Sequence, residues 1–322
     1  MKDDTDEFDT LAGEPVYRIP GDLVLNDPGD ILPAAGPENW GMAVFGVDHL
    51  RSISRGEGIV AGIIDTGIDR NHADIAPNYL DSRDFTGSSF GAADRNGHGT
   101  HCSATVAGAN PSIGVANAAK IVHGKGLSDG GSGSGSGIAA AMRWCVERGA
   151  TVLSMSLGSS GRDPSIDAAG AELTERGIWI VAAAGNSGAG TPDVDFPGRL
   201  PWAISVAALD SNRRVASFSS SGAKINTSGP GVGIWSAKPG GGYQQMSGTS
   251  MATPFVAGVL VCLRAALLKL GRPIPKTAEL LELLKTRSVD VEAPGFDTRT
   301  GPGAVSAALL ANLLVPDPSP VS

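Results

Sequence analysis

Three residues of this sequence have the types and surroundings that a nucleophilic hydrolysis needs. Asp65 follows the apolar run Ile-Val-Ala-Gly-Ile-Ile, His98 lies in Asn-Gly-His-Gly-Thr-His, and Ser250 lies in Gly-Thr-Ser-Met-Ala-Thr-Pro. A serine hydroxyl attacks a carbonyl only when a base takes its proton and a carboxylate holds that base in the right tautomer. The chain order Asp, His, Ser differs from the two other orders known for such triads, Ser, Asp, His and His, Asp, Ser. The three residues predict a serine endopeptidase.

Each of these residues, taken alone, has an ordinary structural explanation. Asp65 could cap a helix, His98 could stabilise a Gly-rich turn, and Ser250 could be an N-cap. Together they favour catalysis, because Asp65 ends a strand and both other residues precede expected helices. A helix N-terminus presents unpaired N–H groups, which suit a serine whose attack generates an oxyanion.

Apolar runs and amphipathic segments alternate along most of the chain. Continuous apolar runs of strand length, expected where a strand is covered on both faces, occur at 59–64, 120–122, 151–156 and 178–184. Helical patterns occur between them at 138–148 and 167–176, and 256–270 is apolar nearly all round, as expected for a buried central helix. This alternation predicts a mostly parallel sheet with helices on both faces.

The composition excludes several classes of protein. The 322 residues include 25 Lys and Arg against 33 Asp and Glu, a net charge of −8, so nucleic-acid binding is not expected. No uninterrupted apolar run of about 20 residues is present, so no membrane span is expected. The N-terminus is acidic where a secretory signal would be basic and then apolar, which favours a cytoplasmic location.

The chain divides into three parts by composition. Residues 1–36 are acidic and rich in Pro and Gly, residues 37–315 carry the alternating pattern, and residues 316–322 form a Pro/Ser-rich tail that we expect to be disordered. The run 130–137 is Gly-Ser repeats without the Lys-Ser/Thr ending of a phosphate loop, so we expect a flexible loop or an exposed strand edge. The three cysteines, Cys102, Cys145 and Cys262, suit neither a disulfide framework nor a zinc site.

The segments around Asp65, His98 and Ser250 resemble the three signature segments of the subtilisin-like serine proteases, the subtilases. The resemblance runs from about Pro37 to Leu314. It implies one α/β domain with a central sheet of about seven strands, Asp65 as orienting carboxylate, His98 as general base and acid, and Ser250 as nucleophile. It further implies that His101 is structural and that the chemistry needs no cofactor.

The resemblance extends to the oxyanion site and to the edges that bind substrate. Asn186, in Ala-Gly-Asn-Ser-Gly after an apolar strand, matches the family's oxyanion-hole Asn, although an Asn before Ser-Gly could also be only a turn residue. Two stretches match the extended edges that pair with the backbone of a peptide or protein substrate, namely Ser156, Leu157 and Gly158 on one side and Gly131, Ser132 and Gly133 on the other.

Asp195 precedes the Phe196-Pro197 pair, at a position that in the family lies at the bottom of the primary specificity pocket. A carboxylate in a pocket of reduced dielectric attracts a Lys or Arg side chain. We therefore expect cleavage after Arg or Lys. The alternative is that Asp195 points to solvent or pairs with Arg199.

A structural calcium ion is an open question. In the family an Asp after the first motif and a loop after the His helix often bind Ca²⁺, and Asp74, Ala109, Ile113 and Val115 occupy those places. Pro111 stands where an Asn ligand is common, which removes one oxygen from a cation that prefers six to eight.

The short segment before residue 37 resembles the extension of the intracellular branch of the family, which lies across the cleft until it is removed. Tyr17-Arg18-Ile19-Pro20 is the candidate occluding element, since a Pro just past a cut site resists attack. The sequence does not separate a broad protease from one that matures a single partner protein, from an esterase of the same fold, or from a catalytically silent binding module. It gives no oligomeric state.

Overall fold

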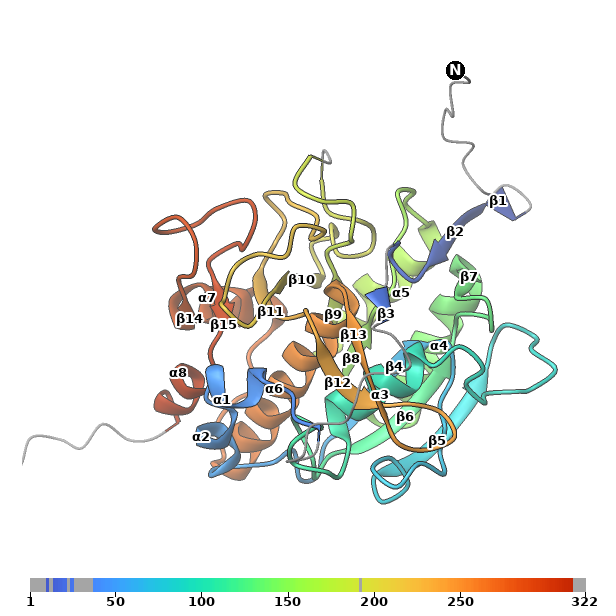
Figure 1. Ribbon diagram of the computed structural model, residues 1–322, viewed down its shortest axis with the longest axis horizontal. Coiled ribbons are helices and arrows are strands. Elements are labelled where there is room, and N and C mark those ends of the chain that lie inside the picture. Colours follow the sequence, from blue (N-terminus) through green and yellow to red (C-terminus); the bar gives the residue numbers. More distant parts are fainter. Residues whose placement is uncertain (1–9, 12–13, 22–23, 26–36, 191–192, 315–322) are drawn as a thin grey trace, which may run out of the picture.

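A nine-stranded sheet forms the centre of the molecule. The computed structural model describes residues 10–11, 14–21, 24–25, 37–190 and 193–314, and Figure 1 shows helices on both faces of the sheet. Along the sheet the strands follow the order β14-β15-β11-β10-β9-β8-β4-β6-β5, and all neighbours are parallel except β14 and β15. The strands are β4 (Val60–Asp65), β5 (Tyr79–Asp84), β6 (Lys120–Lys125), β8 (Ala150–Met155), β9 (Trp179–Ala183), β10 (Ala203–Leu209), β11 (Thr227–Pro230), β14 (Ser288–Val289) and β15 (Ala304–Val305).

The expectation of about seven strands is corrected to nine. Seven of them have four to seven residues, and the two additional strands, β14 and β15, have two residues each. A two-residue strand is too short to produce a periodic pattern, so only pairing along the edge of the sheet defines it.

Side chains of the central strands alternate between two cores. Ile63 of β4 belongs to the core with α3 (His98–Ala107) and α6 (Thr249–Lys269), whereas Ile64 belongs to the core with α4 (Gly135–Glu147) and α5 (Pro164–Glu175). Strands buried on both faces must be apolar throughout, which explains the continuous apolar runs of the sequence.

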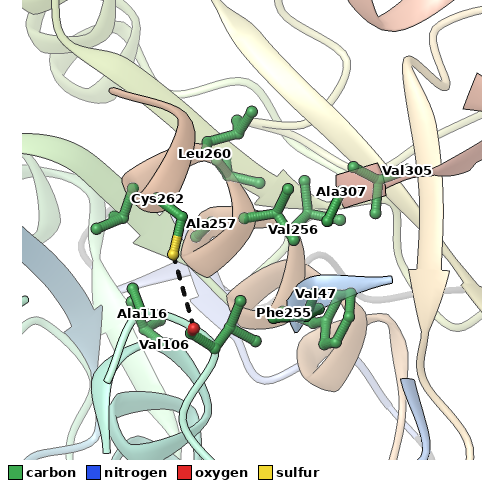
Figure 2. Packing of buried hydrophobic residues seen from close by; sticks show 14 of the residues in the cluster. Val47, Val106, Ala116, Phe255, Val256, Ala257, Leu260, Cys262, Val305 and Ala307 are labelled. Atoms are coloured by element: carbon green, nitrogen blue, oxygen red, sulfur yellow. Dashed lines mark hydrogen bonds between the residues drawn. The ribbon is translucent and has the colours of Figure 1, made fainter. Parts of the chain in front are cut away.

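Helix α6 is the longest helix and begins seven residues earlier than the expected start at Val256. By length and composition it could cross a membrane, but 94% of its most apolar window is buried inside the protein, as in the core helix of a soluble domain. Phe255, Val256, Ala257 and Leu260 pack in the middle of the first core (Figure 2). The expected buried central helix is confirmed.

Smaller elements surround this framework. β12 (Ile234–Ala237), β13 (Tyr243–Ser247) and β3 (Val24–Leu25) form one antiparallel sheet, and β1 (Thr10–Leu11), β2 (Glu14–Arg18) and β7 (Ser132–Ser134) form another. The remaining helices are α1 (Gly41–Val44), α2 (Val47–Arg51), α7 (Thr277–Arg287) and α8 (Ala307–Asn312). The predicted tail 316–322 lies outside the described residues.

Candidate active site

Asp65 and His98 meet at the carboxyl edge of the sheet. Asp65 is the last residue of β4, and His98 is the first residue of α3. The two side chains are fully buried, and His98 Nδ1 lies 2.6 Å from Asp65 Oδ1. The same oxygen accepts the Thr66 N–H at 2.7 Å, so the carboxylate is held by its own turn as well as by the imidazole.

The two groups stabilise each other's charge. Burial opposes ionisation of Asp65, but the positive charge and hydrogen bond of His98 outweigh it and hold the pKa of Asp65 below its usual value. Burial likewise opposes protonation of His98, and the Asp65 carboxylate outweighs it and raises the pKa of His98 well above its usual value. The site therefore favours an imidazole that can accept a proton and hold it beside a carboxylate.

A second buried carboxylate, Asp94, joins the segments on either side of this pair. Its Oδ1 accepts the Thr66 hydroxyl at 3.0 Å, and its Oδ2 accepts the N–H and hydroxyl of Thr100 at 2.8 and 2.6 Å. Thr66 directly follows Asp65, and Thr100 lies two residues after His98. Asp94 thus fixes the first turn of α3 relative to the end of β4.

Ser250 lies in the first turn of α6, and Pro254 determines the environment of its carbonyl group. A residue four positions later would normally donate its N–H to that carbonyl, but Pro has none. The Ser250 carbonyl instead accepts the Ser156 hydroxyl at 2.8 Å and the Cys102 thiol at 3.5 Å. These contacts attach the start of α6 to the end of β8 and to α3.

Cys102 is the link between the base and the serine. Its Sγ lies 3.8 Å from His98 Nδ1 while it contacts the Ser250 carbonyl, and burial raises the pKa of the thiol. All three cysteines are buried and free, as small packed side chains. Ser250 Oγ and His98 Nε2 are both buried, and in the described part of the chain neither has a hydrogen-bond partner. Catalytic hydrogen bonds often tighten only when substrate binds.

Asn186 lies in the loop after β9 with its amide group fixed in one orientation. Its Oδ1 accepts the N–H and the hydroxyl of Thr249 at 2.9 and 2.8 Å, so Nδ2 must face the other way. Nδ2 lies 3.5 Å from the Pro20 carbonyl oxygen. Because Thr249 directly precedes Ser250, the amide donor is attached to the helix turn that carries the serine.

Both sequence-predicted substrate edges contact the N-terminal segment. β2 pairs antiparallel with β7, and Tyr17 lies opposite Gly133 and Arg18 opposite Ser132 (Figure 1). On the other side Arg18 and Gly158 exchange two backbone hydrogen bonds of 2.9 and 2.8 Å. The segment thus lies as an added strand between the two edges.

The N-terminal segment continues toward the catalytic residues. Ile19 N–H donates to the Gly131 carbonyl at 3.0 Å, and the Pro20 carbonyl is the group that faces Asn186. Tyr17 is fully buried in the core with α4 and α5, and its hydroxyl donates to the Gly161 carbonyl at 3.3 Å. The Asn186 amide therefore faces the peptide bond after Pro20.

The Asp195 carboxylate lies between the ends of two strands. A Cβ added to Gly158 would lie 2.8 Å from Asp195 Oδ2, and one added to Gly185 would lie 2.5 Å from it. Burial raises the pKa of Asp195 to about 6, against the opposing charge of Arg199. Arg199 itself bonds elsewhere, with Nε 2.7 Å from the Val194 carbonyl. Among the described residues, no side chain forms a hydrogen bond or ion pair with the Asp195 carboxylate.

The candidate calcium ligands lie together but do not form a complete cation site. Ala109 N–H donates to the Asp74 backbone carbonyl at 2.7 Å, and Asp74 Oδ2 is buried without a partner in the described chain. The Val115 carbonyl, however, accepts Arg51 Nε at 2.9 Å and the Cys262 thiol at 3.6 Å, the dashed contact of Figure 2. Ile113, the remaining candidate ligand, lies two residues before Val115 in the same loop, and its side chain is fully buried.

The Arg51 guanidinium further bonds the carbonyls of Pro111, at 2.9 Å, and Gly114. The Arg51 side chain, which is only 9% exposed, therefore already supplies a positive charge at this loop. With one predicted oxygen engaged and an Asn ligand replaced by Pro, the residues do not fit Ca²⁺ well.

Sequence reasoning missed several polar residues around the site, chiefly Asp94, Thr249, Arg51 and His123. Their side chains act through tertiary contacts, and even the signature segment that contains Thr249 gives no sign of its bond to Asn186. Only His123 left a sign, because it is a polar residue inside the strand pattern Ile-Val-His-Gly-Lys. His101, expected to be structural, bonds the Ile234 carbonyl at 2.9 Å, and burial lowers its pKa to about 3.

A buried carboxylate–imidazole pair beside a serine at a helix N-terminus defines a hydrolase-type site on an α/β sheet. Residues 56–303 match the model of the subtilase family. The chain is 40% identical over 255 residues to Alkaline elastase YaB of Bacillus sp. (strain YaB), covering 78% of this chain and 64% of that protein. It is 36% identical over 316 residues to M-protease of Shouchella clausii (strain KSM-K16), covering 94% and 80%.

A fungal relative, Subtilisin-like protease 7 of Trichophyton tonsurans, is 38% identical over 278 residues, covering 81% of this chain and 65% of that protein. This chain therefore spans slightly less than two thirds of the length of the elastase and of the fungal protease. The chain belongs to the subtilase family.

Proposed function

We propose that the protein is a serine endopeptidase in which Ser250 attacks the peptide carbonyl, His98 takes and returns the proton, and Asp65 holds His98. The observation that carries this proposal is the buried 2.6 Å Asp65–His98 contact, joined through Cys102 to the Ser250 turn, whose hydroxyl is buried without a partner among the described residues. Asn186 Nδ2 and the Ser250 backbone N–H would donate to the oxyanion.

Ser250→Ala is the direct test of this function. We expect a loss of about 10⁶ in kcat, because removing the nucleophile leaves only the oxyanion donors and substrate binding. A fluorophosphonate should label the wild-type chain at Ser250 and leave the variant unlabelled. An unchanged proteolytic rate in Ser250→Ala would refute the proposal, and an unlabelled wild-type chain with no cleavage of any peptide would favour a silent binding module.

We propose further that the pocket at Asp195 prefers Arg or Lys before the cleaved bond. The Asp195 carboxylate is largely buried between Gly158 and Gly185, and no described side chain pairs with it, which supports this preference. Burial makes the unpaired charge costly, and a cationic side chain would remove that cost. Mapping every cut in a peptide mixture tests the preference and also separates broad cleavage from maturation of one partner.

We propose that residues 14–20 inhibit the enzyme by lying in the substrate cleft. The backbone contacts to Gly131, Gly133 and Gly158 support this, since an added strand is the way a protease edge binds peptide. The sequence placed Pro20 just past the cut site, but its carbonyl faces Asn186 Nδ2, so Pro20 would instead be the residue before the cleaved bond. At that position it has no N–H to extend the ladder and no cation for Asp195. A segment with these features would bind without being a good substrate.

We propose that Arg51, instead of Ca²⁺, supplies the positive charge at the 111–115 loop. Its three carbonyl acceptors support this proposal. Hydrogen bonds from a charged donor contribute about 1.5–3 kcal/mol each, enough to hold a loop without a metal.

A further inference from the structure

His123 is a buried histidine in a strand that is otherwise apolar around it, and the roles proposed above do not use it. It lies on β6 opposite Ile63 of β4, two residues before Asp65. Its side chain is fully buried. An imidazole in a core is unfavourable unless its ring nitrogens find partners, so its contacts show which elements it connects.

Both ring nitrogens of His123 are engaged. The Gly67 N–H donates to Nε2 at 3.1 Å, and Nδ1 lies 3.0 Å from Ser103 Oγ. Because a backbone N–H can only donate, Nε2 is the unprotonated nitrogen, and Nδ1–H donates to the Ser103 hydroxyl oxygen. His123 is thereby held as a single neutral tautomer.

These two bonds join the elements that carry Asp65 and His98. Gly67 is the second residue after Asp65, and Ser103 lies on α3, which begins at His98. The packing between them is tight, because a Cβ added to Gly99 would lie 2.2 Å from the Gly67 carbonyl oxygen and 3.0 Å from His123 Cε1. A change at His123 therefore acts directly on the turn of Asp65.

We propose that His123 is a positioning residue for catalysis, whose imidazole joins the turn after Asp65 to helix α3 and so fixes the Asp65 carboxylate against His98. The proposal rests on the triad proposed above. The competing explanation is that His123 only fills space, in which case an apolar side chain of similar size would serve equally well.

The contact requires a neutral imidazole, and the surroundings keep it neutral. Burial lowers the pKa of His123 to about 4; Asp65 and Asp94 oppose this shift, and Lys125 and His98 add to it. Protonation would place an N–H at Nε2 facing the Gly67 N–H and break the bond. The link is therefore lost as the pH falls through about 4.

Three full-length variants test the proposal. His123→Leu retains bulk but has no acceptor for Gly67, whereas His123→Gln has an amide oxygen to accept from Gly67 and an amide N–H to donate to Ser103. His72→Leu is the matched control, since His72 is also buried with both nitrogens bonded, to the Asp74 N–H at 3.1 Å and the Gly242 carbonyl at 2.8 Å. The bonds of His72 involve none of the proposed catalytic residues.

The main readout is an NMR titration of His98 in each full chain, which does not need an open cleft. Asp65 raises the pKa of His98, so a loosened Asp65 must lower it. We expect His123→Leu to lower the pKa of His98 by about one unit and kcat by about tenfold, with KM unchanged. His123→Gln should restore most of both values, and His72→Leu should lower Tm without moving the His98 titration.

An unchanged His98 titration in folded His123→Leu would overturn the proposal. If that variant does not fold, Ser103→Ala decides, because it removes the Nδ1 partner alone and must move the His98 pKa in the same direction. An unchanged His98 titration would refute the role proposed for His123 without refuting the proposed catalytic triad. The titration depends on Asp65 and His98 only, whereas full proteolysis by Ser250→Ala would defeat the triad itself.

Discussion

The two halves of the active site differ in how their polar atoms are bonded. In the Asp65–His98 half, Asp65 Oδ1 has two partners and Asp94 ties the neighbouring turns together, while Asp65 Oδ2 is buried without a partner among the described residues. In the other half, Ser250 Oγ has no partner, nor does His98 Nε2, in the part of the chain that the structure describes. In the proposed mechanism, the groups that hold charge are fixed before substrate arrives, and the groups that react remain free to bond it. Preorganised charge of this kind lowers the barrier without reorganisation during the reaction.

Asp65→Asn removes the carboxylate charge from the Asp65–His98 pair, and we expect it to lower kcat more than the variants that follow. The amide cannot stabilise the imidazolium and can favour the wrong tautomer of His98, so we expect kcat to fall by about 10⁴. Steady-state kinetics on a peptide substrate measure this fall. A loss below tenfold in a folded variant would show that the buried pair is not the catalytic one.

Asn186→Ala removes a donor from the open half. We expect kcat to fall by about 10²–10³ with little change in KM, the cost of one oxyanion-hole donor in this family. Thr249→Val is the companion variant, because it removes the hydroxyl that donates to Asn186 Oδ1 and accepts the Gly185 N–H, while the Thr249 N–H still holds Asn186 Oδ1. It should lower kcat by a smaller factor. A fall in binding alone for Asn186→Ala would place the amide outside the oxyanion site.

Asp195→Asn tests whether the unpaired carboxylate selects substrate. We expect kcat/KM for peptides with Arg or Lys before the cut to fall about 10- to 100-fold, since a charged hydrogen bond contributes about 1.5–3 kcal/mol, with little change for Leu peptides. Asp193→Asn is the matched control, because Asp193 pairs with Arg199 at 3.4 Å.

The preference proposed for Asp195 should depend on pH. The pKa of Asp195 is raised to about 6, so the carboxylate is charged above that pH and neutral below it. The preference for Arg over Leu should therefore be full above a pH of about 7 and decline as the pH falls through 6. A preference that is constant from pH 5 to pH 8 would contradict this assignment.

Tyr17→Ala tests occlusion by the N-terminal segment in the full chain. Truncating a fully buried aromatic side chain should loosen β2, so we expect the activity of the full-length enzyme to rise at least about tenfold, a change of only 1.4 kcal/mol. Initial rates on a small peptide measure the change. Unaltered activity, in Tyr17→Ala and in a chain beginning at Pro37, would show that the segment does not inhibit.

The smallest expected effect concerns calcium. Because Arg51 bonds the loop carbonyls, a chelator should shift the Tm of the wild-type chain by no more than about 1 °C, whereas Arg51→Met should lower it by several degrees. Scanning calorimetry with and without added Ca²⁺ measures both. A clear rise in the Tm of the wild-type chain with added Ca²⁺ would instead support a calcium site at Asp74.

Much of this molecule could be predicted from sequence because local patterns encode it. The apolar runs located β4, β6, β8 and β9, and helix α4 ends within a residue of its expected end. The start of α6 was placed too late, because Pro254 and the small residues before it interrupt the apolar pattern. The helix accommodates Pro254 because the Ser250 carbonyl, which would normally accept the N–H of residue 254, accepts the Ser156 hydroxyl and the Cys102 thiol instead.

The sequence by itself determined the residue types of the site and the strands and helices that carry them, since strand ends and helix starts follow from periodicity and turn residues. Only the tertiary structure decided how those residues are held: the Asp195 carboxylate without a partner among the described side chains, the Arg51 cation among carbonyls, and the link from His123 to the turn of Asp65. These depend on contacts between segments far apart in the chain, whose geometry is set by packing of the whole core and leaves no local pattern.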